Sequence, residues 1–300
     1  MATITWLPEA LGRPRRLAVG EFDGVHLGHR QVIEGADTVL TFDPHPRAVV
    51  APQSAPKLLT SLAVKADLVG RLGVEELVVI PFDGAFARQS PQAFIDDVLV
   101  GHLGAEWVSV GRNFRFGHRA SGDVALLQAQ GAFETRVAEM LELDGEEVSS
   151  TRIRSLVEAG DVAPAARLLG HPFELRGTVQ HGDKRGRTLG YPTANLVPDD
   201  QHVYPAHGVY ACRAGVRDGG GWRRLTAAVN VGVRPTFVTG RGVLVEAFLL
   251  DFAGDLYGQE LRIEFLARLR GEERFDSADA LVEQMARDVE HARRLAADKV

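Results

Sequence analysis

The chain has 300 residues, of which 45% are hydrophobic and 25% charged, and this composition is typical of globular proteins. It excludes collagen-like, mucin-like and wholly disordered classes. At about 150 residues per domain, the length predicts two domains. The 34 Lys and Arg against 40 Asp and Glu give a net charge of −6, which argues against a protein that wraps duplex nucleic acid.

The single cysteine, Cys212, has no partner for an intrachain disulfide, and the first residues show no long apolar stretch before a cleavage site. The longest apolar runs, such as Val243–Leu250, are far shorter than the roughly 18 residues that a membrane-spanning helix needs. We therefore expect a cytoplasmic protein with no membrane or nucleic-acid partner. A homo-oligomer is compatible with the sequence.

The first half alternates short β-branched runs with helical patterns, which predicts an α/β fold with a parallel sheet. The predicted helices cover 62–72 and 91–103, the second with Ser90 as N-cap and Pro91 at its first position. The predicted strands are 17–19, 38–42, 77–80 and 107–110.

The second half changes to strands separated by glycine- and proline-rich turns, which predicts a small all-β barrel. Its predicted strands are 173–179, 208–214, 225–231, 243–250 and 261–269. A helix over 278–297, capped by Ser277, presents an apolar stripe that we expect to pack on the core, made of Val282, Met285, Val289 and Ala292.

The segment 151–169 joins the two halves and carries a helical pattern that is interrupted at Gly160–Asp161. Gly170 ends this pattern, and Pro172 prevents its continuation. The sequence therefore predicts domains of 1–169 and 170–300.

The stretch GEFDGVHLGHR, Gly20 to Arg30, directly follows the first predicted strand. Parallel sheets bind ligands beyond the carboxyl ends of their strands, and Gly24 and Gly28 allow a close approach of backbone to phosphate. His26 and His29 could then donate hydrogen bonds to phosphate oxygens. Two alternatives stay open: the histidines satisfy loop backbone groups, or they bind zinc with a third ligand from elsewhere.

Three more segments end at the same predicted sheet edge. The motif TFDPHP, 41–46, holds His45 in a rigid turn between prolines. The motif GRNFRFGHRASGD, 111–123, brings Asn113, arginines and aromatic rings, which suits a phosphorylated planar ligand. The motif VSSTRIRSL, 148–156, groups hydroxyls with guanidinium groups, which could hold a polyphosphate or simply cap a helix.

A glycine-rich basic loop precedes the motif PTAN, 192–195, in the second half. No Gly-Lys-Ser or Gly-Lys-Thr occurs, so this is not a P-loop. Thr193 and Asn195 offer hard oxygen ligands on one side of an extended segment, which suits Mg²⁺ held together with substrate phosphates. A plain turn is the alternative.

Glu246 is the only ionisable residue in the apolar run 243–250. Burying an unpaired carboxylate costs several kcal/mol, so its presence needs a reason. Either it points outward or pairs with an arginine such as Arg234, or it is a general base that takes a proton from a hydroxyl attacking a γ-phosphate.

In order and spacing, HLGH, TFDPHP, GRNFRFG and SSTRIR resemble the adenylyltransferase half of the bacterial bifunctional riboflavin kinase and FMN adenylyltransferase (FAD synthetase) family. The second half resembles the riboflavin kinase half of that family, a six-stranded barrel with a helix. This second likeness rests on the stretches 177–195, 208–211, 230–237, 245–252 and 269–275.

The resemblance implies that His26 and His29 bind ATP phosphates and stabilise the transition state in which the FMN phosphate displaces pyrophosphate. It implies further ATP- or phosphate-binding residues at Gly20, Phe22, Asp23, Gly24, Gly28, Asn113, Ser150, Thr151 and Arg154.

In the kinase half, the resemblance implies that Glu246 is the base for the ribityl 5′ hydroxyl and that Thr193 and Asn195 contact Mg²⁺ and ATP. Tyr191 would neighbour the flavin. A flap over the nucleotide would include Gly182, Asp183, Lys184 and Arg187.

We therefore expect an enzyme that phosphorylates riboflavin to FMN and adenylylates FMN to FAD, each step using ATP and Mg²⁺. The segment between Arg30 and Thr41 is shorter than the resemblance leads us to expect. The alternatives are a riboflavin kinase with an impaired first half, a flavin-binding regulator without catalysis, and a transferase with a different phosphate acceptor.

Overall fold

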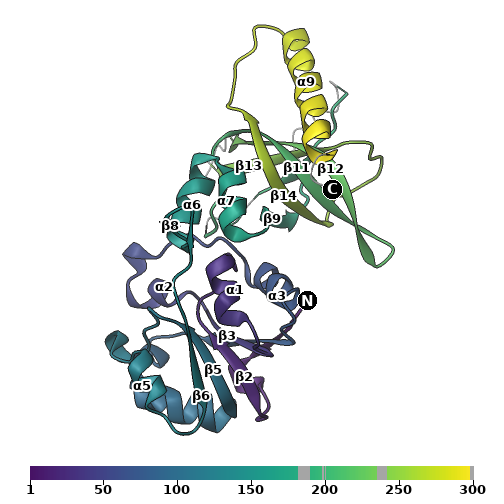
Figure 1. Ribbon diagram of the computed structural model, residues 1–300. Coiled ribbons are helices and arrows are strands. Elements are labelled where there is room, and N and C mark those ends of the chain that lie inside the picture. Colours follow the sequence, from purple (N-terminus) through teal and green to yellow (C-terminus); the bar gives the residue numbers. More distant parts are fainter. Residues whose placement is uncertain (182–189, 198, 200, 235–241, 298–300) are drawn as a thin grey trace. The chain divides into compact units, whose positions relative to one another are not determined.

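The chain forms two compact units, Met1–Ser150 and Thr151–Val300, which are described separately (Figure 1). The computed structural model describes residues 1–181, 190–197, 199, 201–234 and 242–297. The domain limits expected from the sequence, 1–169 and 170–300, stay a prediction.

The first unit is built on a six-stranded parallel sheet, as its alternating sequence pattern predicts. Its strand order is β1-β4-β3-β2-β5-β6. The strands are β1 Thr3–Trp6, β2 Arg15–Val19, β3 Thr38–Asp43, β4 Glu76–Pro81, β5 Ala105–Gly111 and β6 Glu134–Ala138. The four expected strands are confirmed, whereas β1 and β6 escape prediction because both are short edge strands whose side chains alternate with polar groups.

Helices cover both faces of this sheet. The α-helices are α1 Leu27–Ile33, α2 Pro46–Val50, α3 Leu62–Gly70, α4 Pro91–Ala93 and α5 Val124–Gln128, and η4 Phe94–His102 continues α4 as a π-helix. Short 3-10 turns are η1 Leu7–Glu9, η2 Pro52–Ser54, η3 Phe86–Arg88 and η5 His118–Ala120, and β7 Glu142–Leu143 pairs with β8 Glu146–Glu147. The Ser90 hydroxyl accepts the Ala93 N–H at 3.1 Å, which confirms the expected cap.

Alternating side chains divide the core of this unit between the two faces. Leu17 and Val19 of β2 pack in a cluster with Phe94 and Leu99 of η4, whereas Ala18 packs on the opposite side with α1 and α3. The strand order reverses beside β2, because β3 and β5 lie on its two sides. The loops after β2 and β5 therefore meet at a switch point, where open α/β sheets bind ligands.

The second unit is an antiparallel sheet of six strands in the order β10-β13-β12-β11-β14-β9. The strands are β9 Phe173–Thr178, β10 Ala194–Leu196, β11 Gly208–Asp218, β12 Gly221–Arg234, β13 Gly242–Leu249 and β14 Glu260–Arg270. The N–H of Gln180, just beyond β9, donates to the Asn195 carbonyl of β10 at 2.8 Å. This bridge links the two edge strands and closes the sheet into the expected barrel.

Among the described residues of the second unit, the helices are α6 Ser150–Ala159, α7 Val162–Leu169 and α9 Ala278–Ala297. Gly170 ends α7 in the left-handed conformation, with φ 75°, as its sequence position predicts. The Ser277 hydroxyl accepts the Ala280 N–H at 3.2 Å, so the cap of α9 is also confirmed. Helix α9 packs against β11, β12 and β14, where Ala292 is buried.

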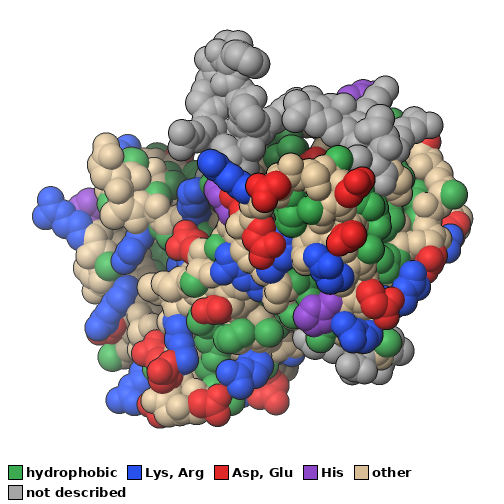
Figure 2. All heavy atoms as spheres, turned by 90° about the horizontal axis from the view of Figure 1, so that it is seen from above, with side chains coloured by type: hydrophobic (Ala, Val, Ile, Leu, Met, Phe, Trp, Pro, Cys, Tyr) green, Lys and Arg blue, Asp and Glu red, His purple; other side chains and the backbone are tan. Residues whose placement is uncertain are grey.

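On the face in Figure 2, positively and negatively charged side chains are interspersed among the coloured atoms. Within the described ranges, no helix has the length and hydrophobicity needed to cross a membrane.

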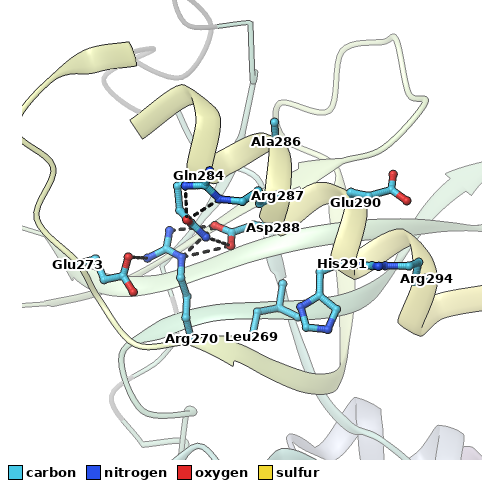
Figure 3. A pocket seen from close by; sticks show the side chains of 10 residues that line it. All are labelled: Leu269, Arg270, Glu273, Gln284, Ala286, Arg287, Asp288, Glu290, His291 and Arg294. Atoms are coloured by element: carbon cyan, nitrogen blue, oxygen red, sulfur yellow. Dashed lines mark hydrogen bonds and ion pairs between the residues drawn. The ribbon is translucent and has the colours of Figure 1, made fainter. Parts of the chain in front are cut away.

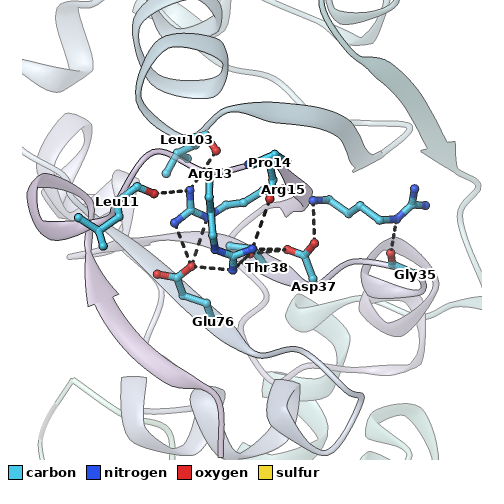
Figure 4. Close-up of polar contacts among 10 residues, drawn as sticks. Leu11, Arg13, Pro14, Arg15, Gly35, Asp37, Thr38, Glu76 and Leu103 are labelled. Atoms are coloured by element: carbon cyan, nitrogen blue, oxygen red, sulfur yellow. Dashed lines mark hydrogen bonds and ion pairs between the residues drawn. The ribbon is translucent and has the colours of Figure 1, made fainter.

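A buried arginine connects three segments at the amino end of the first sheet (Figure 4). Arg15 is only 2% exposed and donates to the Glu76 carboxylate from Nε at 3.2 Å and from Nη2 at 3.1 Å. It also donates to the carbonyls of Leu11 and Leu103 at 2.8 and 3.0 Å. Burial alone would raise the pKa of Glu76, but hydrogen bonds from Thr5, Arg15 and Arg13 and the Arg15 charge lower it below its ordinary value.

We expect Glu76→Gln to lower the free energy of unfolding of the first unit by about 3 kcal/mol at pH 7, because it leaves the Arg15 charge buried without its counter-charge. The folded-state pKa of Glu76 is lowered, so its contribution is present above the unfolded value and is lost as pH falls. The deficit of the variant should therefore shrink below about pH 4.5. Urea unfolding at pH 7 and below about pH 4.5 measures this loss of unfolding free energy. The exposed neighbour Glu75→Gln is the control, and equal deficits in the two variants would contradict the ion pair's role.

Candidate active sites

The loop between β2 and α1, residues 20–26, has an unusual backbone, and we call it the histidine loop. Phe22, Gly24 and Val25 lie in the left-handed region, with φ of 50°, 86° and 42°. Glycine adopts this conformation freely, but an aromatic or β-branched residue there is strained. Phe22 and Val25 are buried, at 2% and 1% exposure, so packing holds them in place.

Buried hydrogen bonds fix the centre of this loop. The Asp23 carboxylate accepts the N–H groups of Leu59 and Thr60 at 2.9 and 3.0 Å and the Thr60 hydroxyl at 3.1 Å. The Gly24 N–H donates to the Thr60 hydroxyl at 3.1 Å, and the Ser150 hydroxyl donates to the Asp23 carbonyl at 2.9 Å. Asp23 and Ser150 therefore hold the loop, and their predicted contacts with ATP stay a prediction.

The two histidines lie together at the start of α1. Their rings stack with centroids 3.5 Å apart and planes inclined by 18°. His26 is the N-cap residue, and its Nδ1 accepts the His29 N–H at 3.2 Å, so a neutral His26 carries its proton on Nε2. A Cβ at Gly28 would lie 3.3 Å from two atoms of the His26 ring, so glycine allows this ring its position.

Aromatic and charged groups surround the histidines. The Phe22 ring packs edge-on against His29 with centroids 5.3 Å apart, which limits the orientations of that imidazole. A Cβ at Gly20 would lie 3.1 Å from the same Phe22 ring. Burial lowers the pKa of Arg30, the next residue along α1.

The loop after β5 supplies the other side of the switch point. Asn113 is exposed, and its Oδ1 lies 3.4 Å from the position that a Cβ of Gly111 would occupy. Phe114 and Phe116 stack with centroids 5.6 Å apart. They end a chain of ring contacts that continues through Phe94, Phe86, Phe82 and Phe42, with centroid separations of 5.5 to 6.2 Å. Phe94 and Phe116 belong to the hydrophobic core on this face of the sheet, and Phe42, Phe86 and Phe114 are partly buried against it.

Thr151 and Arg154 are on α6, in the second unit, so their membership of the histidine site stays a prediction. The His45 ring caps α2 by accepting the Arg47 N–H at 3.1 Å.

In the second unit, strand register aligns three polar residues. Glu246 of β13 lies opposite Asn195 of β10 on one side and opposite Asn230 of β12 on the other. Asn230 Nδ2 donates to Glu246 Oε2 at 3.4 Å. Thus a carboxylate lies between two amides on one face of the sheet, and we call these three residues the acid-amide row.

The acid-amide row lies on the outer face of the barrel. Val245 and Ala247 are fully buried on the core side, whereas Glu246, between them, is half-buried and points the opposite way. Glu246 therefore faces outward beside Asn195, and its role as a general base stays a prediction. An outward carboxylate avoids the cost of burial in the core.

Tyr191 and Thr193 precede Asn195 of the acid-amide row in the chain. The Tyr191 ring packs against Phe248, two residues after Glu246, with centroids 5.1 Å apart. Thr193 is half-buried and two positions before Asn195. The predicted flap residues Gly182, Asp183, Lys184 and Arg187 lie outside the described residues, as does the side chain of Arg234.

Thr193 and Asn195 fit a magnesium site by their chemistry. Mg²⁺ usually binds one or two protein oxygens together with substrate phosphates and water. A hydroxyl and an amide at alternate positions of an extended segment offer such oxygens, and Asn195 is 6% exposed. Among the described residues, no three His, Cys, Asp or Glu side chains are grouped as a metal site.

A polar pocket of about 610 Å³ lies between the end of β14 and one side of α9 (Figure 3). Arg270 donates to both Asp288 carboxylate oxygens, at 3.2, 3.0 and 2.9 Å, and Gln284 donates to Asp288 at 2.9 Å. The ion pair between Arg270 and Asp288 neutralises both charges and attaches α9 to β14. None of the lining residues belongs to the acid-amide row.

Sequence reasoning missed three residues that support these sites: Thr60 and Lys65 beside the histidine loop, and Asn230 in the acid-amide row. Asn230 could have been found from the sequence. It begins the stretch 230–237 that resembles the riboflavin kinase half, and it is a polar residue between the buried Val229 and Val231. Thr60 and Lys65 had no such signal, because their partners are about 40 residues away in the chain.

Comparisons with known proteins agree with both halves. The FAD synthetase family model matches residues 10–152, and the riboflavin kinase family model matches residues 169–296. The chain is 40% identical over 285 residues to the bifunctional riboflavin kinase/FMN adenylyltransferase of Escherichia coli (strain K12), covering 91% of this chain and 90% of that protein. It is 36% identical to the protein of the same name from Bacillus subtilis (strain 168), covering 92% and 90%.

A solved structure has the same fold over nearly the whole chain. It is titled as the crystal structure of a macrolide-efflux protein from Streptococcus pneumoniae. The TM-score is 0.86 at 31% identity, covering 97% of this chain and 98% of that one.

A parallel-sheet unit followed by a barrel, each matching a different transferase family, defines a bifunctional transferase with one activity in each half. The chain belongs to the family of bifunctional riboflavin kinases/FMN adenylyltransferases.

We expect Asp23→Asn to lower the free energy of unfolding of the first unit by about 2 kcal/mol, because an amide nitrogen in place of Oδ2 would face the Leu59 N–H and the carboxylate charge would be lost. Thermal unfolding measures the loss. Asp97→Asn, an exposed change on η4, is the matched control. Equal unfolding temperatures for the two variants would contradict the anchoring role of Asp23.

Proposed function

We propose that the chain converts riboflavin to FMN at the acid-amide row and FMN to FAD at the histidine loop, each step using one ATP. The observation that carries this proposal is the presence of one such arrangement in each unit. In the first unit His26 stacks on His29 at the switch point. In the second unit Glu246 lies beside Asn195. Each half belongs to a family whose model carries the corresponding activity.

In the adenylyl transfer, the FMN phosphate attacks the α-phosphorus of ATP and pyrophosphate leaves, so the protein needs no nucleophile of its own. We assign to His26 and His29 the binding of the triphosphate through ring N–H groups, which stabilise the charge that develops on its oxygens. Gly20, Gly24 and Gly28 allow the phosphates to approach the loop. The partly buried Phe114 ring suits the isoalloxazine system, with Asn113 beside it.

Ser150, Thr151 and Arg154 complete the phosphate contacts in this proposal. A hydroxyl and a guanidinium group favour phosphate oxygens, and Ser150 is already fixed against Asp23.

In the kinase step, we assign to Glu246 the removal of the proton from the ribityl 5′ hydroxyl as its oxygen attacks the γ-phosphate. The half-buried carboxylate is reachable by a substrate, and Asn230 orients one of its oxygens. Tyr191 neighbours the flavin, and the flap contacts of Gly182, Asp183, Lys184 and Arg187 stay a proposal. Thr193 and Asn195 would hold Mg²⁺, which neutralises phosphate charge when bound.

The seven-residue helix α1 bears on the alternative of an impaired first half. Although short, it completes the crossover, because β2 and β3 pair in parallel with Leu17 opposite Thr38. This favours an active adenylyltransferase.

The proposal extends to the cellular location and the partners of the enzyme. We place it in the cytoplasm, since its single Cys212 is buried and unpaired, and burial raises the pKa of that thiol well above its ordinary value. A homo-oligomer remains compatible with the sequence. No nucleic-acid or membrane partner is proposed.

We expect Glu246→Gln to reduce FMN formation from riboflavin by about 10²- to 10⁴-fold, because the amide cannot accept the hydroxyl proton. Conversion of added FMN to FAD should stay unchanged. Chromatography of riboflavin, FMN and FAD follows both steps, and Glu283→Gln, exposed on α9, is the control. Equal loss of both steps would contradict separate sites.

We expect His29→Ala to show the opposite pattern. Formation of FAD and pyrophosphate should fall by about 10²-fold or more, because a phosphate donor is lost, while FMN formation continues. His291→Ala, an exposed change on α9, is the control. An unchanged rate of FAD formation would refute the role of the histidine loop.

A further inference from the structure

Lys65 of α3 is a buried lysine that no step above uses. It is 5% exposed and lies in a helix whose residues from Val64 to Val69 are all buried. Lysine is almost never buried unless its charge is satisfied, because desolvating an ammonium group is costly. The groups that contact the Lys65 ammonium group therefore indicate the structural role of its charge.

The ammonium group binds two elements at the carboxyl edge of the sheet. Lys65 Nζ donates to the Glu21 carbonyl at 2.6 Å and to the Thr41 hydroxyl at 3.0 Å, and lies 3.8 Å from Glu21 Oε2. The Thr41 hydroxyl itself donates to the same Glu21 carbonyl at 3.1 Å. Lys65 thus connects α3, the end of β3 and the first part of the histidine loop.

The Glu21 carbonyl is part of the peptide bond between Glu21 and Phe22. A trans peptide is planar, so fixing this carbonyl also fixes the direction of the Phe22 N–H and the start of Phe22. Phe22 has the strained φ of 50°, and its ring packs edge-on against His29. A line of direct contacts therefore leads from the ammonium group through Glu21 and Phe22 to the second histidine.

We propose that Lys65 is a positioning residue for adenylyl transfer: its ammonium group sets the Glu21–Phe22 peptide and thereby the place of the His29 ring. This inference rests on the proposed role of the histidine loop. Lys65 is buried away from solvent, so it acts through the loop and does not touch the substrate. Displacement of a catalytic group by about 1 Å can cost 10²-fold in rate, which is the scale of effect we expect.

The other anchors make the role of Lys65 separable from folding. Asp23 remains bonded to Leu59 and Thr60 when Lys65 is replaced, so the loop keeps its attachment on that side. Lys65→Met preserves most of the side-chain volume and removes only the charged donor. The kinase activity of the same chain reports whether the protein is intact.

The test uses the full chain with Lys65→Met and Lys65→Ala, and the exposed Lys57→Met as the matched control. For both Lys65 variants we expect kcat for FAD formation to fall by about 10- to 100-fold, with KM for ATP within about twofold and FMN formation unchanged. Adding propylammonium chloride to Lys65→Ala should restore kcat several-fold, whereas potassium chloride at the same ionic strength should not. A purely packing role predicts wild-type kcat in Lys65→Met, which keeps most of the side-chain volume and lacks the ammonium group.

Wild-type kcat in Lys65→Met would overturn the inference, because it would show that the side-chain volume suffices. Recovery no better with propylammonium than with potassium chloride would also overturn it. His29→Ala, measured in parallel, keeps the two proposals apart: if it forms FAD at the wild-type rate, the proposed function of the loop fails, whatever Lys65 does.

Discussion

The buried carboxylate of Asp23 is the contact on which the first site depends. It accepts hydrogen bonds from the Leu59 and Thr60 backbone and so fixes a loop with three left-handed residues. Without such bonds, the strain at Phe22 and Val25 would favour other loop conformations. With them, the loop delivers His26 and His29 as a stacked pair at the point where the strand order reverses. A structural carboxylate thereby fixes the backbone of the proposed phosphate site.

The second site depends on the two-residue period of a β-strand. Val245 and Ala247 enter the barrel core, so Glu246 must face outward, and the registers of β10 and β12 set an asparagine on each side of it. A shift of one residue in either pairing would exchange these amides for apolar neighbours. The barrel core and the chemistry on its outer face are therefore specified by the same pairing.

Much of this fold could be predicted from local sequence pattern, because the signals are short-range. The caps at Ser90 and Ser277 and the helix end at Gly170 depend only on neighbouring residues, and all three are confirmed. The edge strands β1 and β6 were missed because a few polar-alternating residues are weak evidence for a strand. The closeness of His26 and His29 follows from their spacing of three residues, whereas the stacking of their rings is seen only in the structure.

What could not be predicted depends on contacts between distant segments. Lys65 and Thr60 support the histidine loop from about 40 residues away, and no local pattern reveals such a partner. Glu246 stood out as a charge in an apolar run, but its neighbour Asn230 follows only from strand register.

The central claim is that one chain holds two independent active sites, and complementation tests it most directly. The variants Glu246→Gln and His29→Ala are mixed in equal amounts and supplied with riboflavin, ATP and Mg²⁺. Because FMN made by one variant can be used by the other, the mixture should form FAD, although neither variant alone does so at a significant rate. A mixture that forms no more FAD than the two variants do separately would contradict the claim.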